Sequence, residues 1–223
     1  MATVVDRNTQ AESETPTRDR LMYLHRELGI EKAFSLPFAE ISALQIKAAQ
    51  EMFALRRGQI SVLDRRARET GIDAINSFED IVPLLFSHTT YKSYPMSFVN
   101  EGKWDKLLRW FSTLVAKRVD AVDLAGVTDF DGFVNALWAA GHRVVVTNGT
   151  SGKVSLLERT PADDEHLEMQ SLELFCWPRP PKPDKSRHLF MFGPPDGPYM
   201  AFVGVKYLRN FFCRPDSQHF LTD

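Results

Sequence analysis

The sequence predicts an α/β protein with a helical first half and a second half that contains strands. Apolar residues recur at spacings of three and four through much of the first half, as they do on the buried face of a helix. The pattern changes at Gly141, and the β-branched run at 143–147 is typical of a short strand. A turn rich in glycine, threonine and serine follows that run. We therefore expect a helical region over 19–140 and a β-containing region over 141–223.

The composition sets limits on the class of protein. The chain has 223 residues, with 27 Lys and Arg against 29 Asp and Glu, so its net charge is −2. This balance argues against a broad nucleic-acid-binding surface. No run reaches the roughly 18 apolar residues of a membrane span, and the polar first twenty residues lack a secretory signal pattern. Cys176 and Cys213 are too few for a disulfide framework, so we expect a cytoplasmic protein whose cysteines pack as small apolar groups.

The domain organisation follows from the same composition. Residues 1–18 are polar, with no apolar period, and predict a disordered tail. Residues 19–223 are expected to form one domain. Within its first half, apolar spacing and end signals such as Gly29, Gly58 and Gly71 mark the helices. Helices are predicted over 21–28, 37–57, 62–70, 103–118 and 129–140, with a brief one from Ser77 to Pro83.

The second half alternates short strands with turns. A capping threonine, Thr160, is followed by Pro161 and by Asp163, which together predict a helix running to about Phe175. The proline-rich stretch at 177–187 predicts a loop, and the last residues, 214–223, show no clear period. Strands are predicted over 143–147, 153–157, 188–192 and 199–205.

The turn after the first strand carries the clearest chemical signal. Glycines let its backbone approach a ligand closely, and successive N–H groups in such a turn form a concavity that binds anions. Hydroxyl side chains add donors and a lysine adds positive charge, so a phosphate chain is the predicted ligand. An ordinary polar hairpin turn remains the alternative interpretation. The candidate residues are Thr147, Asn148, Gly149, Thr150, Ser151, Gly152 and Lys153.

The run 144–155 resembles the Ser/Thr/Gly-rich signature of adenylate-forming enzymes, in particular the phenylacetate-CoA ligase and acyl-protein synthetase branch. Segments 75–86, 85–95 and 158–163 also resemble stretches of that branch, so the resemblance covers about 37–164. The sequence departs from the pattern at three positions. Asparagine replaces the usual serine at 148, serine replaces a common threonine at 151, and valine replaces a common proline at 154.

The resemblance implies the N-terminal part of an adenylate-forming domain, with strands around a loop that binds ATP phosphates. In that family, ATP, Mg²⁺ and a carboxylic acid substrate give an acyl-adenylate, and the acyl group then passes to a thiol acceptor, either CoA or a protein. The family's adenine, ribose and catalytic-lysine motifs do not occur in this sequence. The implied role is therefore part of a ligase that is inactive alone and is completed by a missing C-terminal half or a partner subunit. No catalytic residue is assigned.

Two other interpretations stay open. One is a shortened, inactive relative that binds a nucleotide or a protein, and the other is a plain helical interaction module with an ordinary hairpin. His88, Tyr91 and Lys92 form a polar loop that either lines a pocket or caps backbone groups. His142 is interpreted as a helix-end histidine. No metal site is predicted, because acids at a helix start complement the helix dipole. The acidic residues at this helix start are Asp163, Asp164, Glu165 and Glu168, with His166 nearby.

Overall fold

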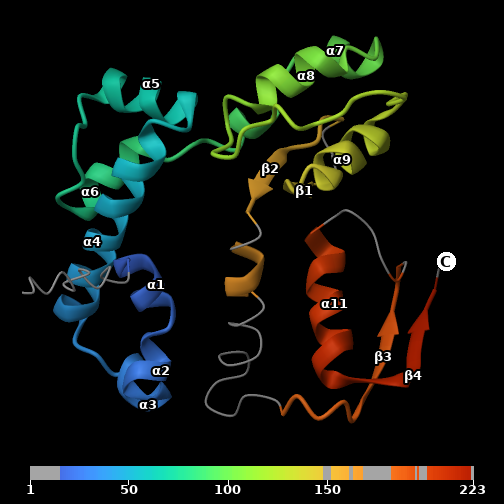
Figure 1. Ribbon diagram of the computed structural model, residues 1–223. Helices are drawn as coiled ribbons and strands as arrows, with labels where there is room; N and C mark the ends of the chain where they lie inside the picture. Colours follow the sequence, from blue (N-terminus) through green and yellow to red (C-terminus); the bar gives the residue numbers. More distant parts are fainter. Residues whose placement is uncertain are drawn as a thin grey trace, which may run out of the picture. The chain divides into compact units, whose positions relative to one another are not determined.

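The computed structural model describes residues 16–147, 152–160, 163–167, 182–193, 195 and 200–221, with only the backbone described over 200–204 (Figure 1). The chain divides into two compact units, Met1–Met52 and Phe53–Asp223. The boundary between them falls inside the long helix α4, Phe38–Arg57. The described part mixes helices with small two-stranded sheets, which confirms the α/β expectation at this coarse level.

The first unit consists of short helices and the first part of α4. Gly29, with a φ of 82°, separates two of these helices, since this backbone conformation favours glycine. The N–H and hydroxyl of Thr17 donate to the carboxylate of Glu51 at 2.8 and 2.5 Å, which joins the first helix to α4. These hydrogen bonds lower the pKa of Glu51. The short helices are α1 (Thr17–Met22), α2 (Leu24–Leu28) and α3 (Ile30–Phe34).

In the second unit, the helices predicted over 62–70 and 129–140 are present to within one residue at each end. The brief helix predicted from Ser77 is present, and it begins with a capping box in which Asp80 is the acidic partner. The helix predicted over 103–118 is shorter and ends at Phe111. The hydroxyl of Ser112 donates to the Arg109 carbonyl and that of Thr113 to the Trp110 carbonyl, both at 2.7 Å, and these bonds compete with the helical ones. The helices between residues 61 and 139 are α5 (Ser61–Thr70), α6 (Phe78–Ile81), η1 (Val82–Leu84), η2 (Thr90–Lys92), α7 (Met96–Asn100), α8 (Trp104–Phe111) and α9 (Phe130–Ala139).

The first sheet is an antiparallel hairpin. Strand β1 (Arg143–Val146) pairs with β2 (Leu156–Arg159), and Val144 lies opposite Glu158. The first strand was predicted correctly within one residue. The second begins three residues later than predicted, because the Tyr94 hydroxyl donates to the Val154 carbonyl at 2.9 Å and holds that stretch outside the ladder.

The second sheet corrects two predictions. Strands β3 (Arg187–Met191) and β4 (Cys213–Phe220) are parallel, and helix α11 (Met200–Phe212) connects them (Figure 1). The strand predicted over 199–205 is therefore wrong, and the stretch 214–223, which showed no period, contributes most of a strand. A parallel pair needs a crossover connection, which a helix usually supplies.

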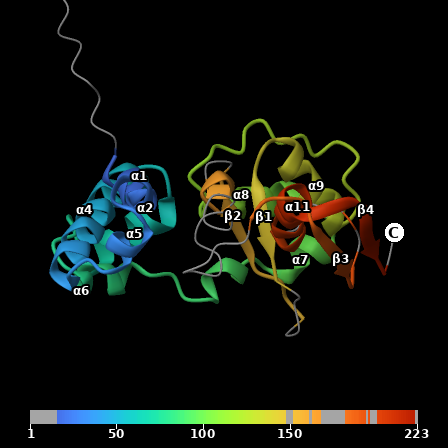
Figure 2. The same ribbon diagram turned by 90° about the horizontal axis from the view of Figure 1, so that it is seen from below.

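The main apolar core of the second unit lies where α8 and α9 meet the β1–β2 hairpin (Figure 2). The Trp104 and Phe133 rings stack there, with centroids 5.9 Å apart. Asp129 caps α9 by accepting from the Gly132 N–H at 2.7 Å. The buried members are Tyr94, Trp104, Leu107, Phe111, Leu114, Val115, Phe133, Leu137, Val144 and Leu156.

Cys213 is a buried free thiol, as expected, whereas Cys176 lies outside the described residues. In the helix predicted from Thr160 to Phe175, residues 163–167 are helical, and the part beyond residue 167 lies outside the described residues. Within the described ranges, none of the helices has the length and apolar character needed to cross a membrane.

Candidate functional site

A cavity of about 580 Å³ lies in the second unit and is lined by positive charges and hydroxyl groups. Its cations come from three separate parts of the chain: Arg65 from α5, Lys92 from η2, and Lys153 from the stretch before β2. No acidic residue belongs to the described lining. The described lining residues are Arg65, Thr89, Thr90, Lys92, Ser93 and Lys153.

The hydroxyl side of the cavity is a short turn held by its own side chains. The Ser87 hydroxyl lies 2.7 Å from that of Thr89 and 3.2 Å from that of Thr90. Ser93 donates to the Thr90 carbonyl at 3.0 Å and accepts from the Trp110 indole N–H at 2.9 Å. Ser93 therefore mainly fixes the turn, while the hydroxyls of Thr89 and Thr90 supply the polar edge that a ligand meets.

Lys153 rests on a buried aromatic ring. Its Nζ lies 4.6 Å from the centroid of the Tyr94 ring, and Tyr94 is only 1% exposed. Gly152, with a φ of 79°, makes the turn that precedes it. Burial lowers the pKa of the Lys153 ammonium, and the nearby charge of Lys92 lowers it further. The site thus holds two lysines close enough to repel each other.

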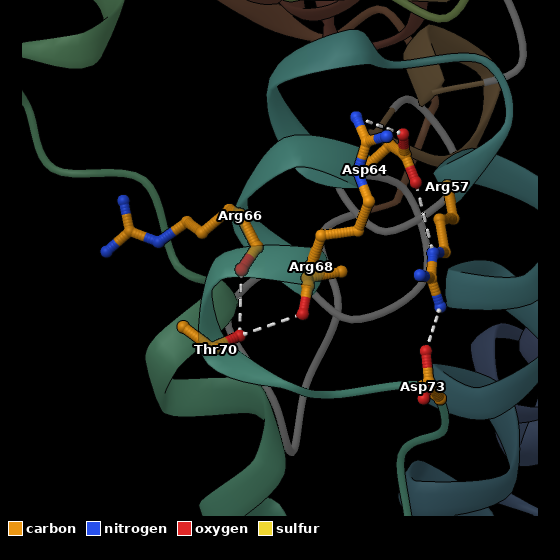
Figure 3. Close-up of polar contacts among 7 residues, drawn as sticks. Arg57, Asp64, Arg66, Arg68, Thr70 and Asp73 are labelled. Carbon is orange, nitrogen blue, oxygen red and sulfur yellow. Dashed lines mark hydrogen bonds and ion pairs between the residues drawn. The ribbon is translucent and has the colours of Figure 1, made fainter.

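Arg65 is placed by the packing of α5. Arg57, at the end of α4, joins Asp64 in the first part of α5 at 3.2 Å and Asp73 in the segment after α5 at 3.1 Å, so it ties α5 and that segment to the preceding helix (Figure 3). Arg68 adds a second ion pair to Asp64 at 2.9 Å (Figure 3). Glu69 lies 3.8 Å from the Arg65 Nε, but both side chains are 65% exposed. An exposed pair of this kind is weak, so it leaves Arg65 able to meet an anion.

The predicted phosphate turn is only partly described. Thr147 closes the hairpin, because its hydroxyl accepts from the Ser155 N–H at 2.9 Å. The stretch 148–151, which holds Asn148, Gly149, Thr150 and Ser151, lies outside the described residues. The described residues of the predicted turn are Thr147, Gly152 and Lys153. Of these three, Lys153 lines the cavity.

The polar loop singled out from the sequence contributes one of its three residues to the cavity's described lining, Lys92. Tyr91 packs against Phe86 instead, with ring centroids 5.9 Å apart, and burial raises the pKa of its hydroxyl. His88 is exposed and is not part of the described lining. Arg65 was missed, because its place beside Lys153 depends on how α5 packs, which sequence spacing does not reveal.

His142 has a structural partner that the sequence did not suggest. Its Nδ1 lies within hydrogen-bonding distance of the Glu158 carboxylate, and both side chains are buried. Because His142 directly precedes β1 and Glu158 lies in β2, the pair joins the two strands at the end opposite the turn. It therefore supports the hairpin from which Lys153 extends.

The described lining of the cavity contains no carboxylate ligand for magnesium. Mg²⁺ is usually bound through one or two carboxylates, and the described lining of the cavity has none. The described parts of the chain contain no group of three His, Cys, Asp or Glu residues suited to a metal. Asp163 instead forms a capping box with Thr160, whose N–H and hydroxyl both donate to its carboxylate at 2.8 Å. Glu168 lies outside the described residues.

Cations and hydroxyls fit phosphate groups, which accept short, charge-assisted hydrogen bonds from both. The arrangement therefore suits a ligand with several negative charges. Comparison of the chain with known protein families, with curated proteins and with solved structures gives no match. The chemistry of the cavity is accordingly the basis on which a function is assigned.

Proposed function

We propose that this chain binds the phosphate groups of a nucleoside triphosphate in the cavity formed by α5, the turn at 89–93 and Lys153. The convergence of three cations from separate segments carries this proposal. Like charges held together repel each other, and an anion placed among them removes that cost. A triphosphate offers several adjacent charges, and the cavity volume of about 580 Å³ is in the range of small-molecule sites.

Calorimetric titration with three ligands tests this function. Inorganic triphosphate and ATP are both expected to bind, and adenosine is expected not to, because the described lining offers cations and hydroxyls and no aromatic ring for the base. Binding should weaken as salt is added, since the site is open to solvent and its charges are screened. Failure of inorganic triphosphate to bind at low salt would refute the proposal. Equal binding of adenosine and ATP would also contradict it, because the phosphates would then contribute nothing.

A second, more specific function is favoured by one observation. Two of the segments that resemble the phenylacetate-CoA ligase branch, 85–95 and 144–155, contribute to the same cavity through Thr89, Thr90, Lys92, Ser93 and Lys153. We propose that the cavity holds the β- and γ-phosphates of ATP while a carboxylic acid attacks the α-phosphorus. The products of that step are an acyl-adenylate and pyrophosphate, and the acyl group then passes to the thiol of CoA or of a protein.

In this second proposal the adenine, magnesium and acid sites come from residues outside this sequence, either on a longer chain or on a partner subunit, in the cytoplasm. Pyrophosphate exchange with protein immunopurified from its source cells tests it, because any completing part is then present. Label from pyrophosphate should enter ATP only when a suitable carboxylic acid is added. Exchange that is absent for a broad series of acids, while triphosphate still binds, would eliminate the ligase function and leave the binding function.

A further inference from the structure

The most distinctive single group in the cavity is the amine of Lys153. It is held against the Tyr94 ring at 4.6 Å; that ring is buried, and its hydroxyl donates to the Val154 carbonyl at 2.9 Å. The amine is therefore presented at a defined place on the cavity wall. It faces the same space as Lys92 and Arg65.

The surroundings of Lys153 favour its neutral form more than those of an exposed lysine do. Burial is the larger influence that lowers the pKa of its ammonium, and the positive charge of Lys92 is the second. A lysine is a nucleophile only when its nitrogen is deprotonated, so this environment increases the share of the reactive form. Arg65 and Lys92 line the same cavity as this amine.

We propose that Lys153 is an acylation site whose reagent is an acyl phosphate bound in the cavity. This inference rests on the proposed phosphate-binding function. Arg65, Lys92 and the hydroxyls of Thr89 and Thr90 hold the phosphate, which brings the attached acyl carbon to the wall where the amine lies. Holding two reactants together in this way converts an encounter into an effectively intramolecular step.

The chemical step balances without a further reactant. The nitrogen lone pair of Lys153 attacks the acyl carbon, a carbon–nitrogen bond forms, and the bond between that carbon and the bridging oxygen breaks. Inorganic phosphate leaves with the electron pair of the broken bond and takes up the proton that the nitrogen loses. The product is a neutral amide. Because acylation removes one of the three described cations, the modified protein binds polyphosphate less tightly.

Peptide mass spectrometry of the intact chain after exposure to acetyl phosphate tests the inference. Lys206 is the matched reference, since it is exposed on α11 and is not part of the cavity's described lining. Acetylation at Lys153 is expected to be at least about tenfold faster than at Lys206, given the gain from holding the reagent in place. Inorganic triphosphate should suppress the reaction at Lys153 and leave Lys206 unchanged.

An uncharged acetylating reagent separates docking from intrinsic reactivity. The Arg65→Gln variant should slow acetyl phosphate at Lys153 and leave the uncharged reagent unaffected. Equal rates at Lys153 and Lys206 would overturn the inference, as would a reaction at Lys153 that triphosphate does not suppress. If triphosphate binds in calorimetry while either of these results is found, the phosphate-binding function stands and only the acylation inference fails.

Discussion

Tyr94 illustrates how one side chain can serve the core and the cavity through different groups. Its hydroxyl donates to the Val154 carbonyl at 2.9 Å, while its ring lies under the Lys153 ammonium and packs edge-on against Trp110. Burial raises the pKa of the hydroxyl, so it stays protonated as a donor. The two roles can be separated by substitution.

The Tyr94→Phe variant should lose about 1 kcal/mol of unfolding free energy, the usual net value of one hydrogen bond, and should keep its triphosphate affinity. Tyr94→Leu should weaken triphosphate binding as well, because it removes the aromatic surface that positions Lys153. Urea unfolding and calorimetry measure the two quantities. Loss of triphosphate affinity in Tyr94→Phe would show that the hydroxyl, rather than the ring, places the lysine.

Asp164 is a buried carboxyl whose stability contribution depends on pH. Burial raises its pKa and outweighs the opposing charges of Arg143, whose Nε lies 3.3 Å away, and of Arg159. A raised pKa means that the folded protein holds the proton more tightly than the unfolded chain. The stabilising contribution of the protonated group is therefore complete at the acid end of the carboxyl range and is lost as pH rises through the raised pKa.

The Asp164→Asn variant carries no ionisable group at this position, so it should gain stability relative to the wild type as the pH rises from acid to neutral. Urea unfolding at a series of pH values measures the difference between the two proteins. A difference that does not change with pH, or one that changes in favour of the wild type as pH rises, would contradict the proposed dominance of burial.

At the scale of elements, α5 is the part that completes the cavity, and its end depends on one glycine. Gly71 closes α5 with a φ of 70°, in the left-handed region, and a Cβ placed there would meet no atom within 4 Å. Gly58, after α4, also has open space around it but lacks a positive φ. The two glycines therefore differ in backbone conformation and not in crowding.

Gly71→Ala should lower the unfolding free energy by about 1 kcal/mol, the cost of the left-handed conformation for a residue with a side chain. Gly58→Ala should be neutral or slightly stabilising, because it restricts the unfolded chain without strain in the fold. Thermal unfolding of both variants provides the comparison. Equal destabilisation by the two substitutions would show that backbone conformation is not what distinguishes them.

The elements that the sequence predicts well are those with a long apolar period or a clear end signal. Helix α4 and helix α5 are of this kind, and the capping groups at Ser77 and Asp129 are in place. The wrong strand at 199–205 belongs to α11, where the buried residues Val205 and Phe212 are seven apart, a helical spacing that the short apolar run concealed. Strand β4 has no alternation of apolar and polar residues in its sequence, so its pairing with β3 was not predictable from that pattern.

Only those residues of the site that stand out in their own stretch of sequence could be predicted. Lys153 and Lys92 were each recognised as polar candidates, one in a glycine-rich turn and one in a loop. Their convergence was not predictable, because it depends on Tyr94 bringing the loop against the start of β2. Arg65 lies still further from Lys153 in sequence, and α5 packs against the core through Val62, whose N–H donates to the Thr113 carbonyl at 3.1 Å.

At the scale of the whole molecule, the main core of the second unit holds the helices and the hairpin together. Leu137 is fully buried in that core, on α9, whereas Leu55 on α4 is 53% exposed. Leu137→Ala should destabilise the protein by about 2–5 kcal/mol, through lost burial and a cavity. Leu55→Ala should change stability by no more than about 0.5 kcal/mol. Urea unfolding measures the unfolding free energy of both variants. Similar decreases in the two would mean that burial in this core does not provide the main stabilisation of the protein.

The cavity brings together parts of the second unit that lie far apart in sequence, so its ligand is the central question for the molecule. The most direct measurement is calorimetric titration of inorganic triphosphate into the wild type and the variants Lys92→Gln, Lys153→Gln and Lys206→Gln. Each cavity lysine should contribute a charge-assisted hydrogen bond. The Lys92→Gln and Lys153→Gln variants should therefore each bind inorganic triphosphate at least about tenfold more weakly than the wild type. The Lys206→Gln control should bind like the wild type. Equal affinities in all four proteins would contradict the account, because the phosphate would then bind elsewhere.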